Sequence, residues 1–187
     1  MVRAERPWWC DWDRVLFMLI EMSACRLAQG IAEGEFSSRE VVEAHIACIE
    51  RVNPKLNAMV EPRFDAARTE ADVADAERAK GFSRGTFHGV PCTIKEFFGV
   101  EGMRNTGGLY AYRDRMAPGD ATDVARLKGA GAIILGTSNA PEGGLWMETH
   151  NKIYGRTSNP WNTRRTSGGS SGGEGALVAA GASPIGL

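Results

Sequence analysis

The stretch DATDVARLKGAGAIIL, residues 120–135, decides the fold class because it joins a helix signal to a strand signal. Asp120 is a residue type that can cap a helix, and the pattern predicts a helix from there to about Lys128. Gly129-Ala130-Gly131 then supplies a turn, and the apolar run at 132–135 is typical of a strand buried on both faces. A helix that leads into such a strand predicts an α/β fold with a layered sheet, in which ligands bind at strand ends.

Two further helices are predicted before this unit. The first begins at Ser37-Ser38-Arg39-Glu40, a capping-box pattern, and should stop at Asn53-Pro54 because proline cannot continue a helix. The second is rich in alanine and charge and runs roughly from Phe64 to Lys80, where Gly81 ends it. The amino-terminal third of the chain is therefore predicted to be helical.

Between these helices and residue 120 lies a β-prone run, His88 to Ile94. Its Pro91 indicates an edge position or a strand start, and the run places Lys95 at its carboxyl end. After the strand at 132–135, residues 136–173 are predicted to be almost all loop, rich in Gly, Asn, Ser, Thr and Pro. So long a loop in a compact domain is usually functional or wrongly assigned.

Composition excludes several classes of protein. The 187 residues carry 22 Lys and Arg against 23 Asp and Glu, a net charge of −1, which argues against a nucleic-acid partner. Hydrophobic residues at 43% and charged residues at 24% are ordinary for a globular domain. All but two of the 23 glycines follow residue 80. The second half must therefore contain tight turns or close backbone approaches.

Residues 1–22 are predicted to be an amino-terminal extension, and residues 23–187 the domain. The apolar run at 15–20 is too short for a signal peptide or a membrane span. Three interpretations stay open: an interfacial membrane helix, a packing extension, or translated sequence upstream of a true start at Met22. The four cysteines form no C-x-x-C pair, which favours reduced thiols and a cytoplasmic location.

The Gly/Ser run at 166–173 leads directly into a small-residue segment, 174–180, that is predicted to be a buried helix. Alone, the run has a flexible linker as its alternative. Its place before a helix favours a binding site instead, because a helix start presents free N–H groups and a positive dipole end. Neither phosphate-loop nor dinucleotide glycine pattern is present, and no cluster has metal-ligand spacing. No cofactor and no metal is therefore expected.

A serine in this run would need a base. His88 and His150 have no acidic partner at a suggestive position, and His45 is predicted to be a packed or surface histidine of the first helix. Lys95 follows an apolar strand, and desolvation there would lower its pKa toward the range in which the amine accepts a proton. The alternative for Lys95 is an ordinary solvated surface charge.

Two motifs bear on this choice. Gly89-Val90-Pro91-Cys92-Thr93-Ile94-Lys95-Glu96 resembles the G-[VI]-P-x-x-[VIL]-K-[DE] motif of the amidase signature family, and residues 168–176 resemble the first half of its glycine/serine signature. The resemblance covers about residues 23–187. Within the family, the segment 146–157 is most similar to the fatty acid amide hydrolase-like branch. The A-type amidotransferase component usually differs there and has Asp-Asn after the lysine, where this chain has Glu96-Phe97.

The resemblance implies the N-terminal part of a mixed β-sheet core covered by helices, incomplete at its carboxyl end. It also implies hydrolysis of a small-molecule amide by a Ser–cis-Ser–Lys mechanism. Lys95 would be the neutral base, Ser170 the bridging cis-serine that relays the proton of the nucleophile, and Ser171 a support that orients Lys95. By the same resemblance, the nucleophile serine and the oxyanion-hole donors would belong to an element that lies beyond Leu187.

A chain without that element is expected to be inactive, because both the nucleophile and the donors that stabilise the transition state are missing. It is also expected to fold poorly, with an unpaired sheet edge where the next strand belongs. Two other functions remain open: an amidotransferase A-type subunit that works inside a complex, and a non-catalytic remnant or binding module that retains the helices and the Lys95 loop.

Overall fold

The structure, a computed structural model, describes residues 18–187 and has a mixed sheet at its centre. The strands are β1 (Met59–Pro62), β2 (Pro91–Lys95) and β3 (Ile133–Ser138), in the order β1-β3-β2. β2 runs parallel to β3, whereas β1 is antiparallel to it. The predicted mixed α/β fold is confirmed, and Pro91 both starts β2 and lies on the outer strand of this sheet.

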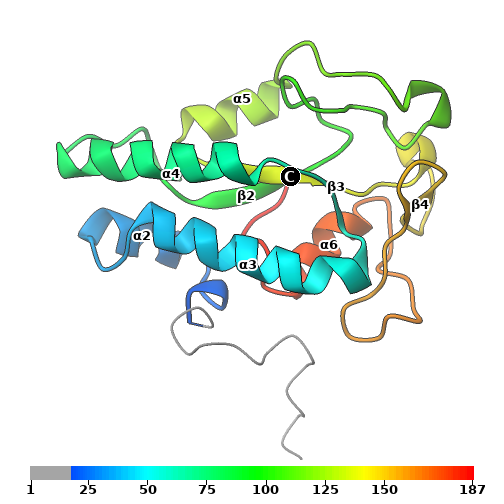
Figure 1. The fold of residues 1–187 in the computed structure, drawn as a ribbon, viewed down its shortest axis with the longest axis horizontal. Helices are drawn as coiled ribbons and strands as arrows, with labels where there is room; N and C mark the ends of the chain where they lie inside the picture. The colour runs from blue at the N-terminus through cyan, green and yellow to red at the C-terminus, as the bar shows by residue number, and fades with distance from the viewer. Residues whose placement is uncertain (1–17) are drawn as a thin grey trace, which may run out of the picture.

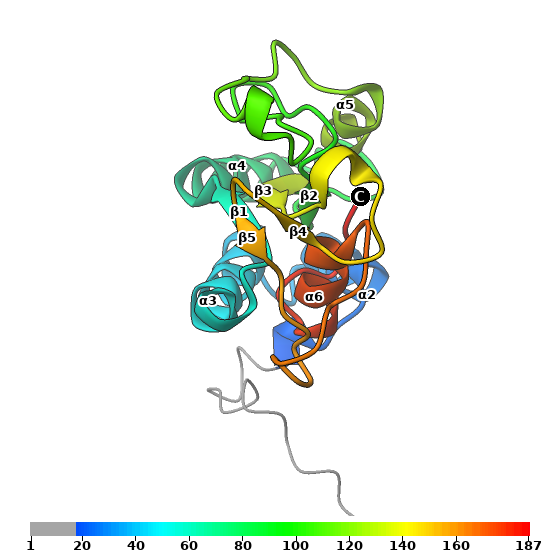
Figure 2. The same ribbon diagram turned by 90° about the vertical axis from the view of Figure 1, so that its right-hand side faces the viewer.

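Helices cover both faces of the sheet (Figures 1 and 2). On one face lie α2 (Ala24–Glu33), α3 (Ser38–Leu56) and α6 (Gly172–Ala179), and on the other lies α5 (Thr122–Gly129). Another helix, α4 (Phe64–Ala79), packs against α3 and β3. The layers form because side chains alternate along each strand: Ile133 and Leu135 join the main apolar cluster, and Ile134 joins a second cluster under α5.

α3 begins as the sequence predicts and ends later. Ser37 Oγ accepts from the Glu40 N–H at 3.0 Å, and the Glu40 carboxylate accepts from the Ser37 N–H at 2.7 Å, which completes the capping box. The predicted stop at Asn53-Pro54 is wrong, because Pro54 lies inside the last turn. Pro54 removes one helical N–H donor, but the helix ends two residues later, and the Asn53 side chain accepts from the N–H groups of Ala58 and Met59 just beyond that end, both at 2.8 Å.

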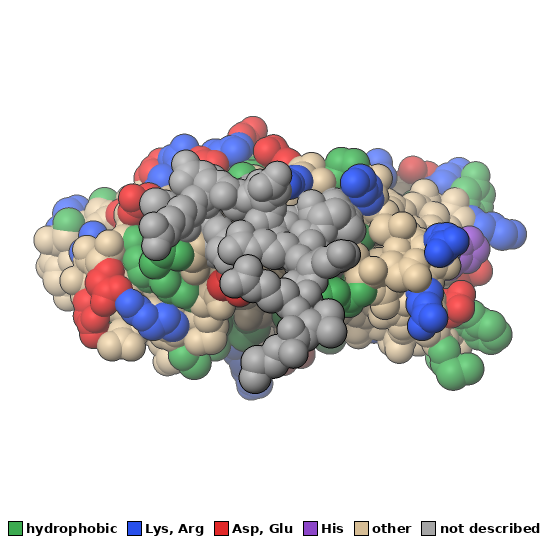
Figure 3. Space-filling view, turned by 90° about the horizontal axis from the view of Figure 1, so that it is seen from below, with side chains coloured by type: hydrophobic (Ala, Val, Ile, Leu, Met, Phe, Trp, Pro, Cys, Tyr) green, Lys and Arg blue, Asp and Glu red, His purple; other side chains and the backbone are tan. Residues whose placement is uncertain are grey.

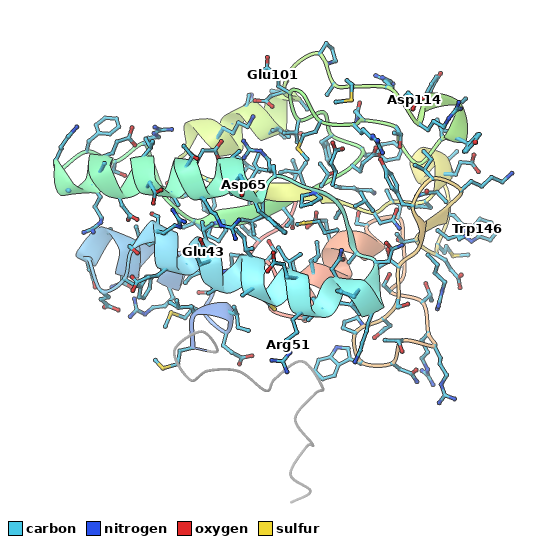
Figure 4. All side chains as sticks on the ribbon, in the orientation of Figure 1. Glu43, Arg51, Asp65, Glu101, Asp114 and Trp146 are labelled. Atoms are coloured by element: carbon cyan, nitrogen blue, oxygen red, sulfur yellow. The ribbon has the colours of Figure 1, made fainter. Side chains whose placement is uncertain are left out.

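α3 and α4 are joined by ion pairs. Arg68 of α4 contacts Glu43 of α3 at 2.9 Å and Asp65 of its own helix at 3.1 Å, and both carboxylates are labelled in Figure 4. All of these groups are partly or fully exposed, so each pair contributes little to stability. On the face seen in Figure 3, acidic and basic side chains are interspersed over the described residues.

The unit at 120–135 differs from its prediction in two places. Asp120 does not cap α5, which has Ala121 at its N-cap position and no side-chain cap. Lying one residue too early, Asp120 accepts from Lys128 Nζ at 2.7 Å and from the Glu101 N–H at 2.8 Å. In addition, β3 continues to Ser138, because the polar residues after the apolar run remain buried and paired with β1 and β2.

The long segment after β3 is mainly loop, as predicted. It contains the one-turn helix η2 (Glu142–Gly144) and a short antiparallel pair, β4 (His150–Asn151) and β5 (Gly155–Arg156). A similar one-turn helix, η1 (Tyr110–Tyr112), lies between β2 and α5. Figure 2 shows β4 and β5 at the end of the molecule where β2 and β3 finish.

The last residues of the chain lie against β2 (Figure 1). Thr93 donates its N–H to Ile185 O at 3.2 Å, Lys95 donates to Leu187 O at 2.8 Å, and Leu187 donates to Thr93 O at 3.1 Å. The open edge that the sequence predicts is therefore not found at β2, because residues 185–187 occupy it.

At the other end, Leu19 and Ile20 lie in the main apolar cluster. The proposed interfacial helix falls mostly on residues 1–17, outside the described part of the chain. Between residues 18 and 187, none of the helices has both the length and the apolar character that a membrane span requires.

Candidate active site

The Gly/Ser run is held in place by close contacts, so it is not a flexible linker. A Cβ at Gly169 would lie 2.6 Å from Trp146 O, and one at Gly173 would lie 2.5 Å from Asn139 N. Thr149 Oγ1 accepts from the Gly172 N–H at 2.9 Å and donates to Gly168 O at 2.9 Å. Glycine is needed at these positions because two backbones approach each other where a side chain would stand.

This packing places two serines immediately before α6. The Gly169–Ser170 peptide bond is cis, and Ser171 occupies the N-cap position of the helix. Lys95, at the end of β2, donates from Nζ to Ser170 Oγ at 2.8 Å and to Ser171 Oγ at 3.0 Å. The structure therefore brings Lys95, Ser170 and Ser171 into one hydrogen-bonded group.

The environment of Lys95 changes its pKa in two opposing ways. Partial burial lowers the pKa, because the ammonium loses water, and the negative charge of Glu174 raises it. The lowering is the larger effect. The Phe97 ring lies 5.5 Å from Nζ, close enough to favour the cation as well. Lys95 is thus not an ordinary solvated surface charge.

Sequence reasoning did not assign a role at this site to two residues near Lys95, Thr93 and Glu174. Glu174 of α6 is only 7% exposed and accepts from Thr93 Oγ1 at 2.6 Å. Burial raises the pKa of Glu174 to about 7. One signal was available in the sequence: Thr93 precedes Lys95 by two positions, so both side chains point to the same face of the strand.

The side chain of the next residue, Glu96, forms a different set of contacts. Its carboxylate accepts from the N–H groups of Thr106 at 2.6 Å and Gly107 at 2.9 Å, and from the Tyr154 hydroxyl at 3.2 Å. Burial raises the pKa of Glu96, and these donors oppose the rise. Glu96 therefore fixes the loop that follows β2.

An amide network fixes the loop on the other side of the serines. Asn151 donates to Asn139 Oδ1 at 2.8 Å, and Asn139 donates to Thr157 Oγ1 at 3.0 Å. Both asparagines are buried. Trp146, in contrast, is 63% exposed and points outward at the end of the molecule that carries β4 (Figure 4).

The histidines take no part in this group. His45 is buried in α3, where its Nδ1 contacts Val41 O at 2.8 Å and burial lowers its pKa to about 4. In His88, Nδ1 accepts from the Arg84 N–H at 3.2 Å and Nε2 contacts Ala74 O at 3.0 Å. Over residues 18–187, no three His, Cys, Asp or Glu side chains gather in a way that would hold a metal ion.

Comparison with known proteins identifies the family. The family described as Amidase matches residues 40–187. The chain belongs to the amidase signature family. A solved structure of a fatty acid amide hydrolase superposes with a TM-score of 0.90 at 30% identity, covering 94% of this chain and 31% of that one.

Curated relatives from the amidase signature family include hydrolases and amidotransferase components. Fatty-acid amide hydrolase 2-B of Danio rerio is 48% identical over 176 residues, which are 90% of this chain and 34% of that protein. The A-type component of the glutamyl-tRNA(Gln) amidotransferase of Streptomyces coelicolor is 37% identical over 169 residues, again 90% of this chain and 34% of the relative. The chain thus spans about a third of the length of the relatives it matches.

Proposed function

We propose that this chain carries the lysine and bridging-serine part of an amide-hydrolysing active site. The observation that supports it best is the contact of Lys95 Nζ with Ser170 Oγ at 2.8 Å, in a site where burial lowers the pKa of the lysine. A neutral amine at that distance can take a proton from a serine hydroxyl. The membership of the chain in the amidase signature family gives the reaction class.

In this mechanism Lys95 acts as the base and Ser170 as the relay. As the nucleophile serine attacks the amide carbon, its proton passes to Ser170 Oγ while the Ser170 proton passes to Lys95 Nζ. When the C–N bond breaks, Ser170 protonates the leaving amine and recovers a proton from Lys95. Ser171, 3.0 Å from Nζ, holds the lysine in line. Water then hydrolyses the acyl-enzyme.

The nucleophile and the oxyanion-hole donors are proposed to lie beyond Leu187. The relatives support this, since they are about three times as long as this chain.

The substrate is proposed to be a small-molecule carboxamide. Cys25 and Cys92 form no disulfide, which supports a reducing, cytoplasmic location.

An amidotransferase A-type subunit is the second candidate. Its support is the 37% identity to the component from Streptomyces coelicolor. Against it stand Glu96-Phe97 after the lysine, the segment at 146–157, and the higher identity to a fatty-acid amide hydrolase. A non-catalytic remnant, the third candidate, would be indicated by a stop codon directly after Leu187.

Hydrolysis assays on a panel of fatty, aryl and short-chain amides test the proposal. The 187-residue chain is expected to give no turnover, and a version extended along the reading frame past Leu187 is expected to hydrolyse at least one amide. In the extended version, Lys95→Ala and Ser170→Ala should each lower kcat/KM by a factor of roughly 10⁴. Lys80→Ala, at an exposed position at the end of α4, is the matched control and should leave kcat/KM unchanged. Turnover by the 187-residue chain, or full activity of Lys95→Ala, would overturn the mechanism.

A further inference from the structure

The side of the sheet that faces α6 holds a buried polar group behind Lys95. Thr93 and Lys95 alternate with the apolar Cys92 and Ile94, which belong to the cluster under α5, so the polar pair faces α6. Ser138 of β3 lies opposite Lys95 in the parallel register. Glu174 of α6 meets this group from the helix side.

Glu174 is enclosed. Its side chain is 7% exposed, and a Cβ at Gly186 would overlap its Oε2 atom, so the backbone at Gly186 closes one side. Oε2 accepts from Thr93 Oγ1, whereas Oε1 and Ser138 Oγ are both buried without a hydrogen bond of ordinary geometry in the described part of the chain. The Ser138 hydroxyl is still close enough to lower the pKa of Glu174.

A buried carboxylate that accepts only one hydrogen bond recovers little of the free energy that it loses when its charge leaves water. Burying a charge is costly unless it is paired or fully hydrogen-bonded. Protonation relieves this cost at low pH, because burial raises the pKa of Glu174 to about 7. Once the carboxylate is ionised, the remaining compensation is a positive charge, and Lys95 supplies it from the same face of β2 as Thr93, the residue that Glu174 contacts. The attraction is mutual, since the negative charge of Glu174 acts in the same way on Lys95.

The other groups around the pair are neutral or directed elsewhere. Burial, together with the negative charge of Glu174, raises the pKa of the Cys92 thiol to about 12, so the thiol stays neutral. Ser170, Ser171 and the Phe97 ring, which contact Nζ, carry no charge. The Glu96 carboxylate is directed to Thr106, Gly107 and Tyr154.

We propose that Glu174, oriented by Thr93, is a positioning residue for Lys95: its buried carboxylate is the counter-charge that stabilises the ammonium formed when Lys95 takes up a proton. The inference deepens the proposed function and rests on it for the role of Lys95 as a base. Ser170 and Ser171 hold the amine by hydrogen bonds, and Glu174 acts on it through its charge.

The test is to measure the pKa of Lys95 directly, by NMR titration of the 187-residue chain labelled with ¹³C-lysine. The signal of Lys95 is assigned as the one that disappears in the Lys95→Arg variant. The chain has five lysines in all: Lys55, Lys80, Lys95, Lys128 and Lys152. Glu174→Gln keeps the size of the side chain and an acceptor for Thr93 but removes the charge. The expected result is a fall in the Lys95 pKa of roughly one unit, the usual effect of one nearby charge. An unchanged pKa would overturn the proposal.

Glu96→Gln is the matched control, because it also removes a buried carboxylate, from the residue that follows Lys95. Its side chain is directed away from Nζ, so the Lys95 pKa should not change, and an equal fall in both variants would also overturn the proposal. If Glu174→Gln does not fold, Thr93→Val answers the same question. Loss of the Thr93 donor raises the pKa of Glu174 and weakens its charge at a given pH, so Lys95 should again titrate lower, and no change would reject the proposal.

The titration separates this inference from the proposed function. It reads the coupling of two side chains and requires no catalysis. In an extended, active version, Glu174→Gln should move the acidic limb of kcat/KM against pH to lower pH by the same amount. A coupled Lys95 in a protein whose Lys95→Ala variant retains full activity would disprove the proposed function and leave the coupling intact.

Discussion

At the scale of single residues, Glu174 should make the stability of the folded chain depend on pH. Its pKa is about 7 when folded and near 4.5 in an exposed carboxyl group, so the folded state binds more protons between those values. Its contribution to stability is therefore fully present below about pH 4.5 and is lost as the pH rises through 7. The loss is about 3 kcal/mol in total, at about 1.4 kcal/mol per pKa unit, and it is nearly complete at pH 7.

Urea unfolding at pH 5, 6, 7 and 8 measures this loss. Glu174→Gln does not titrate at this position, so the free energy of unfolding of the variant should fall by about 2–3 kcal/mol less than that of the unaltered chain over this range. Parallel pH profiles for the two proteins would show that the burial of Glu174 does not perturb its titration.

At the scale of elements, the start of α6 depends on glycines that differ in what surrounds them. A Cβ at Gly172 would overlap Thr149 Oγ1, whereas nothing lies within 4 Å of a Cβ at Gly175 on the same helix. Gly172→Ala should therefore destabilise the chain by about 1–3 kcal/mol, the usual cost of overpacking. Gly175→Ala, the matched control, should stabilise it by about 0.5–1 kcal/mol, because alanine favours a helix.

Urea unfolding distinguishes the two substitutions, and NMR shows whether Ser170 and Ser171 move. Displacement of the serines in Gly172→Ala should return the Lys95 pKa toward its ordinary value, since the lysine would regain water. Equal stability of both variants would mean that the close approach to Thr149 does not fix the run.

The elements that could be predicted from the sequence are those that local signals determine. The capping box at Ser37 needs only residues three positions apart, and the apolar run at 132–135 identifies its own strand. Asp120 has the chemistry of a cap, but the neighbouring Lys128 and the Glu101 N–H take its carboxylate. The extension of β3 to Ser138 depends on strands paired on both sides, which polar composition does not reveal.

The site follows the same rule. Lys95, Ser170 and Ser171 could be predicted because each lies in a recognisable motif. Their meeting requires β2 and α6 to pack together, which is a property of the whole fold. Glu174 lies in the first turn of α6, and its burial against Thr93 depends on that same packing.

At the scale of the whole molecule, the end of the chain closes the sheet that carries Lys95. Residues 185–187 exchange three backbone hydrogen bonds with Thr93 and Lys95 and cover the outer edge of β2. Deletion of these residues should free the N–H groups of Thr93 and Lys95 and leave an exposed strand edge, which promotes association between copies. Hydrogen exchange followed by NMR should then show faster exchange at both amides.

Two amides on the far side of the sheet provide an internal control. The Arg63 N–H donates to Leu135 O at 2.9 Å and the Asn139 N–H to Ala58 O at 2.8 Å, and neither bond involves the deleted residues. Their exchange should change little, so that the ratio of rates between the two sets isolates the edge from any general loss of stability. If Thr93 and Lys95 stay as protected as before, residues 185–187 do not hold the edge of β2. Lys95 would then be held by the pairing of β2 with β3 and by the contacts of its Nζ atom with Ser170 and Ser171.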